Sequence, residues 1–143
     1  MENETDFSGW DIIICDPDKD VVYQVSCDAS RLGFRMITIC FDGLDLTKAI
    51  SEADNPAKTI VISEVRLPPF YDGLEIMEET KKTSQRDMRF IFLTFRGRDE
   101  DYIRLLHFPF DVIDYYLIKP FDPVKLQNAL TRIIQPTEET PEK

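Results

Sequence analysis

Histidine and cysteine, two residue types that commonly bind metal ions, are scarce in this sequence. There is one histidine, His107, and the three cysteines, Cys15, Cys27 and Cys40, lack the Cys-x-x-Cys spacing typical of metal ligands. We therefore predict no histidine-dependent reaction and no cysteine-based metal site. Two of the cysteines lie at the ends of apolar runs, so we interpret them as reduced thiols of the core.

Positive charge and long apolar runs are scarce as well. The chain has 17 Lys and Arg against 27 Asp and Glu, a formal net charge of -10. Nucleic-acid binding needs clustered Lys and Arg, so the composition argues against it. No apolar run approaches the ~20 residues of a membrane-spanning helix, and the acidic N-terminus is unlike a signal peptide. The sequence therefore predicts a cytoplasmic protein with no membrane partner.

Five short apolar runs, rich in β-branched and aromatic residues, are present instead. Their hydrophobicity is nearly continuous rather than alternating, which is typical of parallel strands covered on both faces. The runs are residues 11–15, 36–41, 59–63, 90–94 and 115–118. Patterns of helical spacing follow each run, so the alternation predicts an α/β fold with a doubly wound sheet.

The ends of the predicted helices carry capping signals. Gly33 is a natural stop for a helix that starts near Asp20, and Pro123 suits the first position of the last helix. Asp122 precedes Pro123 at the start of that helix, and three further helix starts are assigned to acidic residues: Asp45, Asp72, and Asp99 or Asp101. The predicted organisation is a flexible N-terminus over 1–9, one domain over 10–135, and an acidic flexible tail or linker over 136–143.

Four polar residues close four of the five apolar runs: Asp16, Glu64, Thr94 and Lys119. In an open parallel sheet, ligand groups gather at the carboxyl ends of the strands. We therefore expect these four side chains to form one pocket of the kind that binds a phosphoryl group.

Several segments of the chain resemble the receiver domain of response regulators in two-component signalling, a chemotaxis-regulator-like family. The resemblance covers roughly residues 11–134. It rests on Ile12 to Asp16, on Leu67-Pro68 with Asp72 to Glu75, on Phe92 to Thr94, and on Tyr116 to Phe121. It implies a flavodoxin-like (βα)5 fold with strand order 2-1-3-4-5. It also marks Pro120 as a cis-proline candidate, because the family carries a usually cis proline after its lysine.

The resemblance implies a specific chemistry, from which this chain departs twice. In the family an aspartate at the end of the third strand attacks a phosphoryl donor, and two acids after the first strand hold Mg²⁺. A threonine and a lysine of the family bind the phosphoryl oxygens, and Thr94 and Lys119 match them. Here Glu64 occupies the phosphoacceptor position, and Pro17 occupies that of the second metal acid, with Asp18 one residue later. We interpret the chain as an atypical receiver, or pseudo-receiver, with no catalytic residue and a vestigial metal ligand in Asp16. Mg²⁺ binding is predicted to be weak or absent.

The predicted function is signalling by phosphorylation-independent protein–protein interaction, with a kinase, an output domain or another regulator as partner. Glu64 is expected to approach Lys119 and fill the pocket, either as a mimic of the phosphorylated state or as a record of its loss. Tyr116 matches the aromatic switch residue of the family. Phe108 and Phe110 are candidate interface residues for docking, or for a homodimer through the fourth helix, fifth strand and fifth helix.

Two alternatives stay open at this stage. A weakly phosphorylatable receiver would use Asp16 and Asp18 for Mg²⁺. A phosphatase like the haloacid dehalogenases would use Asp16 as nucleophile and Asp18 as general acid. Against the phosphatase, a helix starts directly after Asp20, leaving no room for a flap, and no pair of acids follows Lys119 on a later strand.

Overall fold

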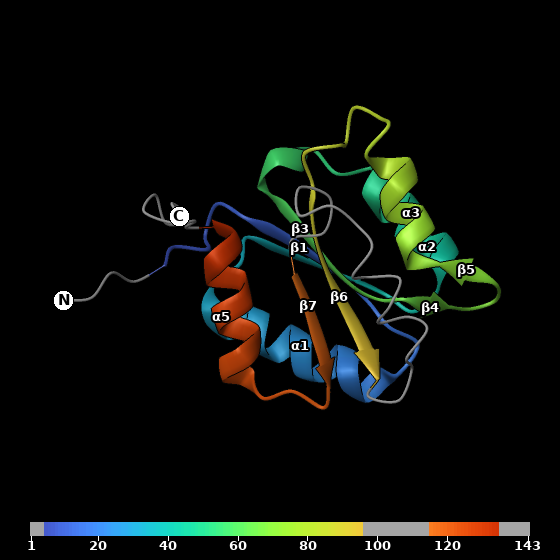
Figure 1. Cartoon of the computed structure of the whole chain (residues 1–143). Coiled ribbons are helices and arrows are strands. Elements are labelled where there is room, and N and C mark those ends of the chain that lie inside the picture. Colours follow the sequence, from blue (N-terminus) through green and yellow to red (C-terminus); the bar gives the residue numbers. More distant parts are fainter. Residues whose placement is uncertain (1–4, 96–114, 135–143) are drawn as a thin grey trace, which may run out of the picture.

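A single parallel sheet forms the centre of the molecule (Figure 1). The computed structural model describes residues 5–95 and 115–134. The sheet has five strands in the order β2-β1-β3-β6-β7. Their bounds are β1 Asp11–Cys15, β2 Met36–Cys40, β3 Thr59–Glu64, β6 Arg89–Phe95 and β7 Tyr115–Lys119. Because β6 and β7 are the fourth and fifth strands of this sheet, the predicted fold and the order 2-1-3-4-5 are confirmed.

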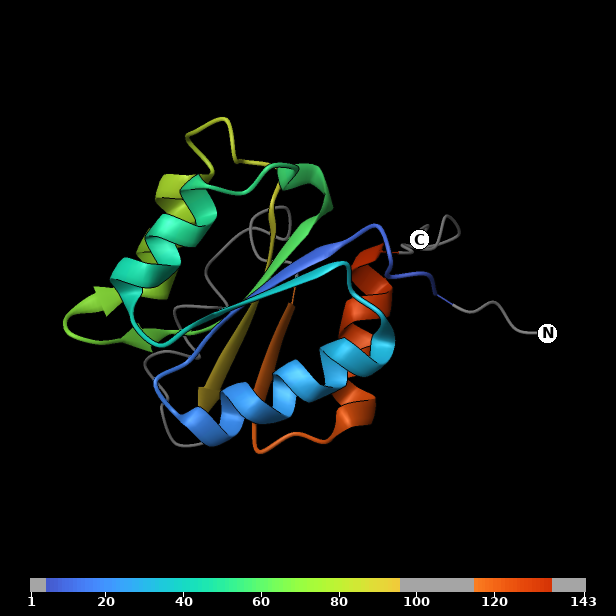
Figure 2. The same cartoon turned by 180° about the vertical axis from the view of Figure 1, so that it is seen from behind.

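Helices cover both faces of the sheet, as the continuous hydrophobicity of the strands predicted (Figures 1 and 2). Ile12 and Ile14 of β1 belong to the apolar core under one pair of helices, while Ile13 and Cys15 belong to the core under the other pair. The first pair is α1 (Lys19–Leu32) and α5 (Pro123–Ile134), and the second is α2 (Gly43–Ser51) and α3 (Gly73–Thr80). A short 3-10 turn, η1 (Pro56–Lys58), precedes β3.

Aspartate side chains cap the starts of four described helices. The predicted caps Asp72 of α3 and Asp122 of α5 accept from the backbone N–H groups of Leu74 and Lys125, both at 2.9 Å. Asp18 accepts a hydrogen bond from the backbone N–H of Asp20 at the start of α1, and Gly33 ends that helix in the left-handed region with φ of 94°. The cap predicted for α2 is corrected. Asp42 is the N-cap, and Asp45 lies in the first turn, where its N–H donates to Asp42 at 2.8 Å.

The packed domain begins earlier than the predicted boundary at residue 10. Phe7 is 2% exposed and stacks on Phe34, with ring centroids 4.9 Å apart. Trp10 is also buried, and its backbone N–H donates to the carbonyl of Phe7 at 3.0 Å. The apolar side chain at position 7 therefore ties this segment to the core under α1 and α5.

A small antiparallel hairpin that the sequence did not predict lies between β3 and α3. It consists of β4 (Arg66–Leu67) and β5 (Tyr71–Asp72). Pro68 to Phe70 connect the two strands. In Figures 1 and 2 the hairpin lies beside one end of α2 and α3. Within the described ranges, no helix combines the length and apolar character needed to cross a bilayer.

Candidate functional site

The carboxyl ends of β1, β3 and β7 bring three charged side chains together. Asp16 directly follows β1, while Glu64 and Lys119 are the last residues of β3 and β7. The register pairs Cys15 with Ser63, so the next residues, Asp16 and Glu64, leave adjacent strands at the same level. The parallel sheet therefore produces the convergence that the sequence predicted.

Lys119 forms two ion pairs at this edge of the sheet. Its Nζ lies 2.6 Å from Oδ2 of Asp16 and 2.6 Å from Oε1 of Glu64. The side chains of Lys119, Asp16 and Glu64 are only 5%, 1% and 4% exposed. Charge-assisted hydrogen bonds of this length are among the stronger polar contacts in proteins, and burial reduces their screening by salt. We call Asp16, Glu64 and Lys119 the ion triad.

The remaining oxygens of the two carboxylates are also hydrogen-bonded. Oδ1 of Asp16 accepts from the backbone N–H of Asp18 at 2.8 Å, and Oε2 of Glu64 accepts from that of Val65 at 3.0 Å. Each carboxylate oxygen of the triad therefore has a donor, which offsets the cost of burying it. These two backbone donors could not be recognised from residue types, because every residue except proline has one.

Thr94 lies in β6 beside the triad but does not join it. Its residue is 1% exposed, and its hydroxyl has no hydrogen-bond partner among residues 5–95 and 115–134. The carboxylate of Glu64 bonds to Lys119 and not to Thr94. The structure thus brings Asp16 and Lys119 together with Glu64, whereas Thr94 is buried without a bond to them.

The residues after β1 do not fit a Mg²⁺ ion, which prefers several oxygen ligands in octahedral geometry. Pro17 has no side-chain oxygen to bind a metal ion, and both carboxylate oxygens of Asp16 already accept hydrogen bonds. The carboxylate of Asp18 caps α1 through its bond from Asp20 at 2.9 Å. In the part of the chain that the structure describes, no three His, Cys, Asp or Glu side chains form a metal-binding group.

Some of the other candidate residues lie outside the residues that the structure describes. Tyr116 is half-buried on β7 and packs against the core under α2 and α3. The peptide bond between Lys119 and Pro120 is cis, as is that between Pro68 and Pro69. Phe108, Phe110 and His107 lie outside the described residues, as do residues 136–143, so the predicted interface and homodimer stay predictions.

Two buried thiols lie close to the site. Burial, with neighbouring Cys40 and Asp16, raises the pKa of Cys15, whose Sγ donates to the carbonyl of Asp42 at 3.4 Å. Burial and the carboxylates of Asp45 and Asp42 raise the pKa of Cys40 from 9.0 to about 11. Both thiols therefore stay protonated at neutral pH, in agreement with their interpretation as core residues.

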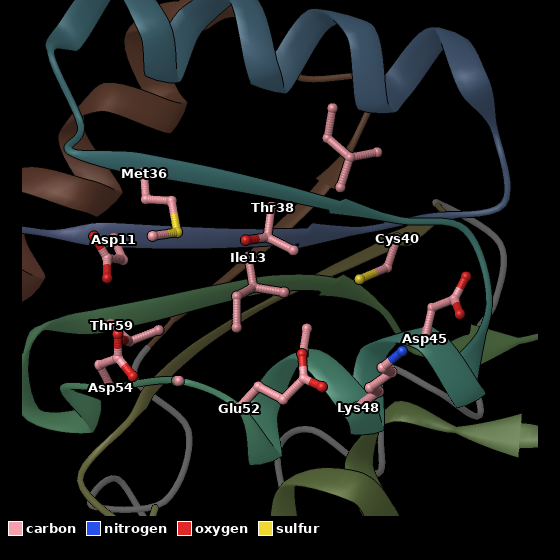
Figure 3. A pocket seen from close by; sticks show the side chains of 13 residues that line it. Asp11, Ile13, Met36, Thr38, Cys40, Asp45, Lys48, Glu52, Asp54 and Thr59 are labelled. Atoms are coloured by element: carbon pink, nitrogen blue, oxygen red, sulfur yellow. The ribbon is translucent and has the colours of Figure 1, made fainter.

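A small hollow of about 270 Å³ lies between β2 and α2 (Figure 3). Its wall includes four carboxylates, on Asp11, Asp45, Glu52 and Asp54, and one ammonium, on Lys48. The acids come from different elements, and Asp11 is already paired with Arg35 at 2.6 Å. Within the described ranges, no three of these acids form a group that could hold a metal ion.

Comparison with known proteins finds a similarity to response regulators. No family model matches the chain. It is 24% identical over 127 residues to PhoP of Bacillus subtilis, the alkaline phosphatase synthesis transcriptional regulatory protein. That match covers 89% of this chain and 49% of PhoP, so the chain spans about half the length of this relative.

Solved structures of response regulators superpose on most of the chain. The chemotaxis response regulator CheY4 of Vibrio cholerae has a TM-score of 0.72 at 21% identity, covering 87% of this chain and 98% of that one. Response regulator DrrB of Thermotoga maritima, an OmpR/PhoB homologue, has a TM-score of 0.70 at 28% identity, covering 88% and 52%. Together with the similarity to PhoP, these matches show that the chain has the fold of response-regulator receiver domains.

Proposed function

We propose that this chain is an atypical receiver that is not phosphorylated and acts in signalling by contact with other proteins. One observation carries the proposal: Lys119 binds the carboxylates of both Asp16 and Glu64 at 2.6 Å, with all three side chains buried. The cation that a receiver offers to a phosphoryl group is thus already engaged by the side chain at the phosphoacceptor position.

The electrostatics of the ion triad oppose entry of a further anion. The triad combines one positive and two negative charges in a buried site, and a phosphoryl group would add negative charge without a new cation. To reach Lys119, such a group would have to displace Glu64, and a buried charge that loses its partner costs about 3–5 kcal/mol. The chain therefore favours its internal carboxylate over an external phosphoryl donor.

The absence of a fit for Mg²⁺ supports the same proposal. Metal ions in phosphoryl transfer neutralise charge that develops on the transferred group. With Pro17 in place of an acid and Asp18 committed to capping α1, the residues after β1 offer little of that neutralisation. This arrangement also weighs against the weakly phosphorylatable receiver, which needs the carboxylate of Asp18 for metal.

The contacts of Glu64 indicate how far its carboxylate resembles a bound phosphoryl group. Glu64 makes the contact to Lys119 that a phosphoryl oxygen would make, but the buried hydroxyl of Thr94 has no partner among the described residues. We therefore propose that Glu64 reproduces the lysine contact of the phosphorylated state without the threonine contact. The pocket is then held in one arrangement and does not switch.

No observation favours the phosphatase. A nucleophilic carboxylate needs an oxygen exposed to substrate, whereas Asp16 has a side chain that is 1% exposed and donors on both oxygens. The general acid assigned to Asp18 is the cap of α1. These contacts are those of a structural ion pair and not of a nucleophile with its general acid.

Amide spectra recorded with Mg²⁺ and beryllofluoride, a mimic of the phosphoryl group, test the proposal. The expected result is that the resonances of Glu64, Thr94 and Lys119 do not move when both are added. A conventional receiver measured beside it provides the positive control. Saturable shifts at these three residues would show that the pocket accepts a phosphoryl group and would refute the proposal.

A further inference from the structure

A second and larger hollow, of about 670 Å³, lies between α2, α3 and the β4–β5 hairpin. Figures 1 and 2 show these elements side by side on the sheet face opposite α1 and α5. Its volume is in the range of ligand and peptide sites, ~300–1,000 Å³. We call it the α2–α3 groove, and it is separate from the ion triad.

The walls of the α2–α3 groove are held in place by specific contacts. The N–H of Gly43 donates to the carbonyl of Pro68 at 3.0 Å, and a Cβ on Gly43 would lie 2.2 Å from Cβ of Tyr71. Only glycine at position 43 therefore lets the hairpin pack against the start of α2. At the other end, the amide of Gln85 donates to the carbonyls of Ile50 and Ala53 at 2.9 and 3.1 Å. The groove is thus preformed, which reduces the entropy cost of binding.

The hairpin presents an aromatic side chain to solvent at the rim of the groove. Phe70 is 98% exposed and Tyr71 is 38% exposed, and both line the groove with the half-buried Ile76 of α3. A phenylalanine this exposed gains nothing from the core of its own domain. Exposed aromatic residues beside a hollow are typical of protein-binding surfaces.

The charged residues among the described lining of the groove are all acidic. Asp72, Glu75 and Glu79 line it, and no Lys, Arg or His is among its described lining residues. Lys82 lies 3.6 Å from Glu79, but both side chains are more than 70% exposed, so this pair is weak. With a net charge of -10 on the chain, the groove attracts a cationic partner and repels an acidic one.

We infer that the α2–α3 groove docks a basic, amphipathic segment of a partner protein. Its apolar side chain packs between Phe70 and Ile76, and its Lys or Arg residues lie against Glu75 and Glu79. The inference names the partner class for the proposed function and rests on it only in taking protein contact as the output. It does not depend on whether the ion triad accepts a phosphoryl group.

Selection from a random twelve-residue peptide library displayed on phage tests the inference, with the purified full chain as bait. The expected result is enrichment of peptides that combine Lys or Arg with an aromatic or long aliphatic residue. Synthetic copies of the enriched peptides are then titrated into the chain by fluorescence anisotropy. We expect Phe70→Ser to weaken binding about tenfold, as at interface hot spots. Glu79→Lys is expected to weaken it about threefold, as for a rim charge.

Glu78→Lys is the matched control. Glu78 is exposed on α3 next to Glu79 but does not line the groove, so the same charge change should alter affinity less than about twofold. Melting temperatures of all variants show whether they fold. No enrichment, enrichment of acidic or uncharged peptides, or equal binding by Phe70→Ser would overturn the inference. Beryllofluoride shifts with intact peptide binding would instead overturn the proposed function alone.

Discussion

Replacement of Lys119 by methionine is the most direct test of the ion triad. Methionine keeps most of the length and volume of the side chain but removes the ammonium, so it leaves Asp16 and Glu64 as two buried carboxylates without a cation. Each carboxylate would retain a single backbone donor, from Asp18 and Val65 respectively. The change therefore isolates the charge from the packing.

The expected loss follows from the geometry. Removing one partner of a buried ion pair costs about 3–5 kcal/mol, and here one cation serves two carboxylates at 2.6 Å. We expect Lys119→Met to lower the free energy of unfolding by about 4 kcal/mol, a large part of the ~5–15 kcal/mol of an ordinary domain. At about 2–4 °C per kcal/mol, the melting temperature should fall by roughly 8–16 °C.

Urea unfolding at pH 7, followed by the fluorescence of the single tryptophan, measures this loss. Trp10 is 8% exposed in the folded chain and becomes exposed on unfolding. Lys82→Met is the control, because Lys82 is paired only at the surface and should cost less than about 1 kcal/mol. A loss below about 1 kcal/mol for Lys119→Met would refute the reasoning.

Glu64→Gln completes the comparison of charges within the triad. The amide keeps an oxygen that can face Lys119 and removes the second negative charge, leaving a simple pair with Asp16. The NH2 group of the amide then meets the backbone N–H of Val65, which loses its acceptor. We therefore expect a loss of about 1–3 kcal/mol in the free energy of unfolding, below that of Lys119→Met. Equal losses for the two variants would mean that the triad does not have an excess of negative charge to relieve.

Three further predictions concern the metal position, the hairpin and the thiols. Glu64→Asp alone should not give phosphorylation by acetyl phosphate, whereas Glu64→Asp with Pro17→Asp should give more, as measured by phosphate-affinity gel; equal yields would contradict the role of Pro17. Gly43→Ala should cost about 1–3 kcal/mol in urea unfolding, because its Cβ would overlap the hairpin; an unchanged midpoint would contradict that close approach. Burial raises the pKa of Cys40 to about 11, so iodoacetamide at pH 8.5 should modify only the exposed Cys27 as long as the chain is folded. Mass spectrometry identifies the modified residue, and labelling of Cys40 in the folded chain would contradict this prediction.

The convergence of the triad could be predicted from the sequence because it depends only on parallel strands and their ends. Asp16, Glu64 and Lys119 each close an apolar run, and a parallel sheet aligns those ends. The path of the Glu64 side chain could not be predicted to the same degree. Whether its carboxylate bonds to Lys119, to Thr94 or to both depends on side-chain rotamers, which residue spacing does not determine.

Other features were missed because their local signals are weak or duplicated. Asp42 and Asp45 both precede the apolar pattern of α2, and either suits an N-cap by residue type. The hairpin has strands of two residues each, too short to show any periodicity. Phe7 is one apolar residue in a polar stretch, so only its contact with Phe34 reveals that it belongs to the core.

The ion triad also has a consequence for how the domain holds together as a unit. Lys119 is separated along the chain from Asp16 by 103 residues and from Glu64 by 55. It therefore ties the edge strand β7 to two inner strands, β1 and β3, although β7 pairs only with β6 within the sheet. Local opening of β7 would leave the buried carboxylates of Asp16 and Glu64 without their cation. We therefore expect this edge strand to unfold together with the centre of the sheet rather than on its own.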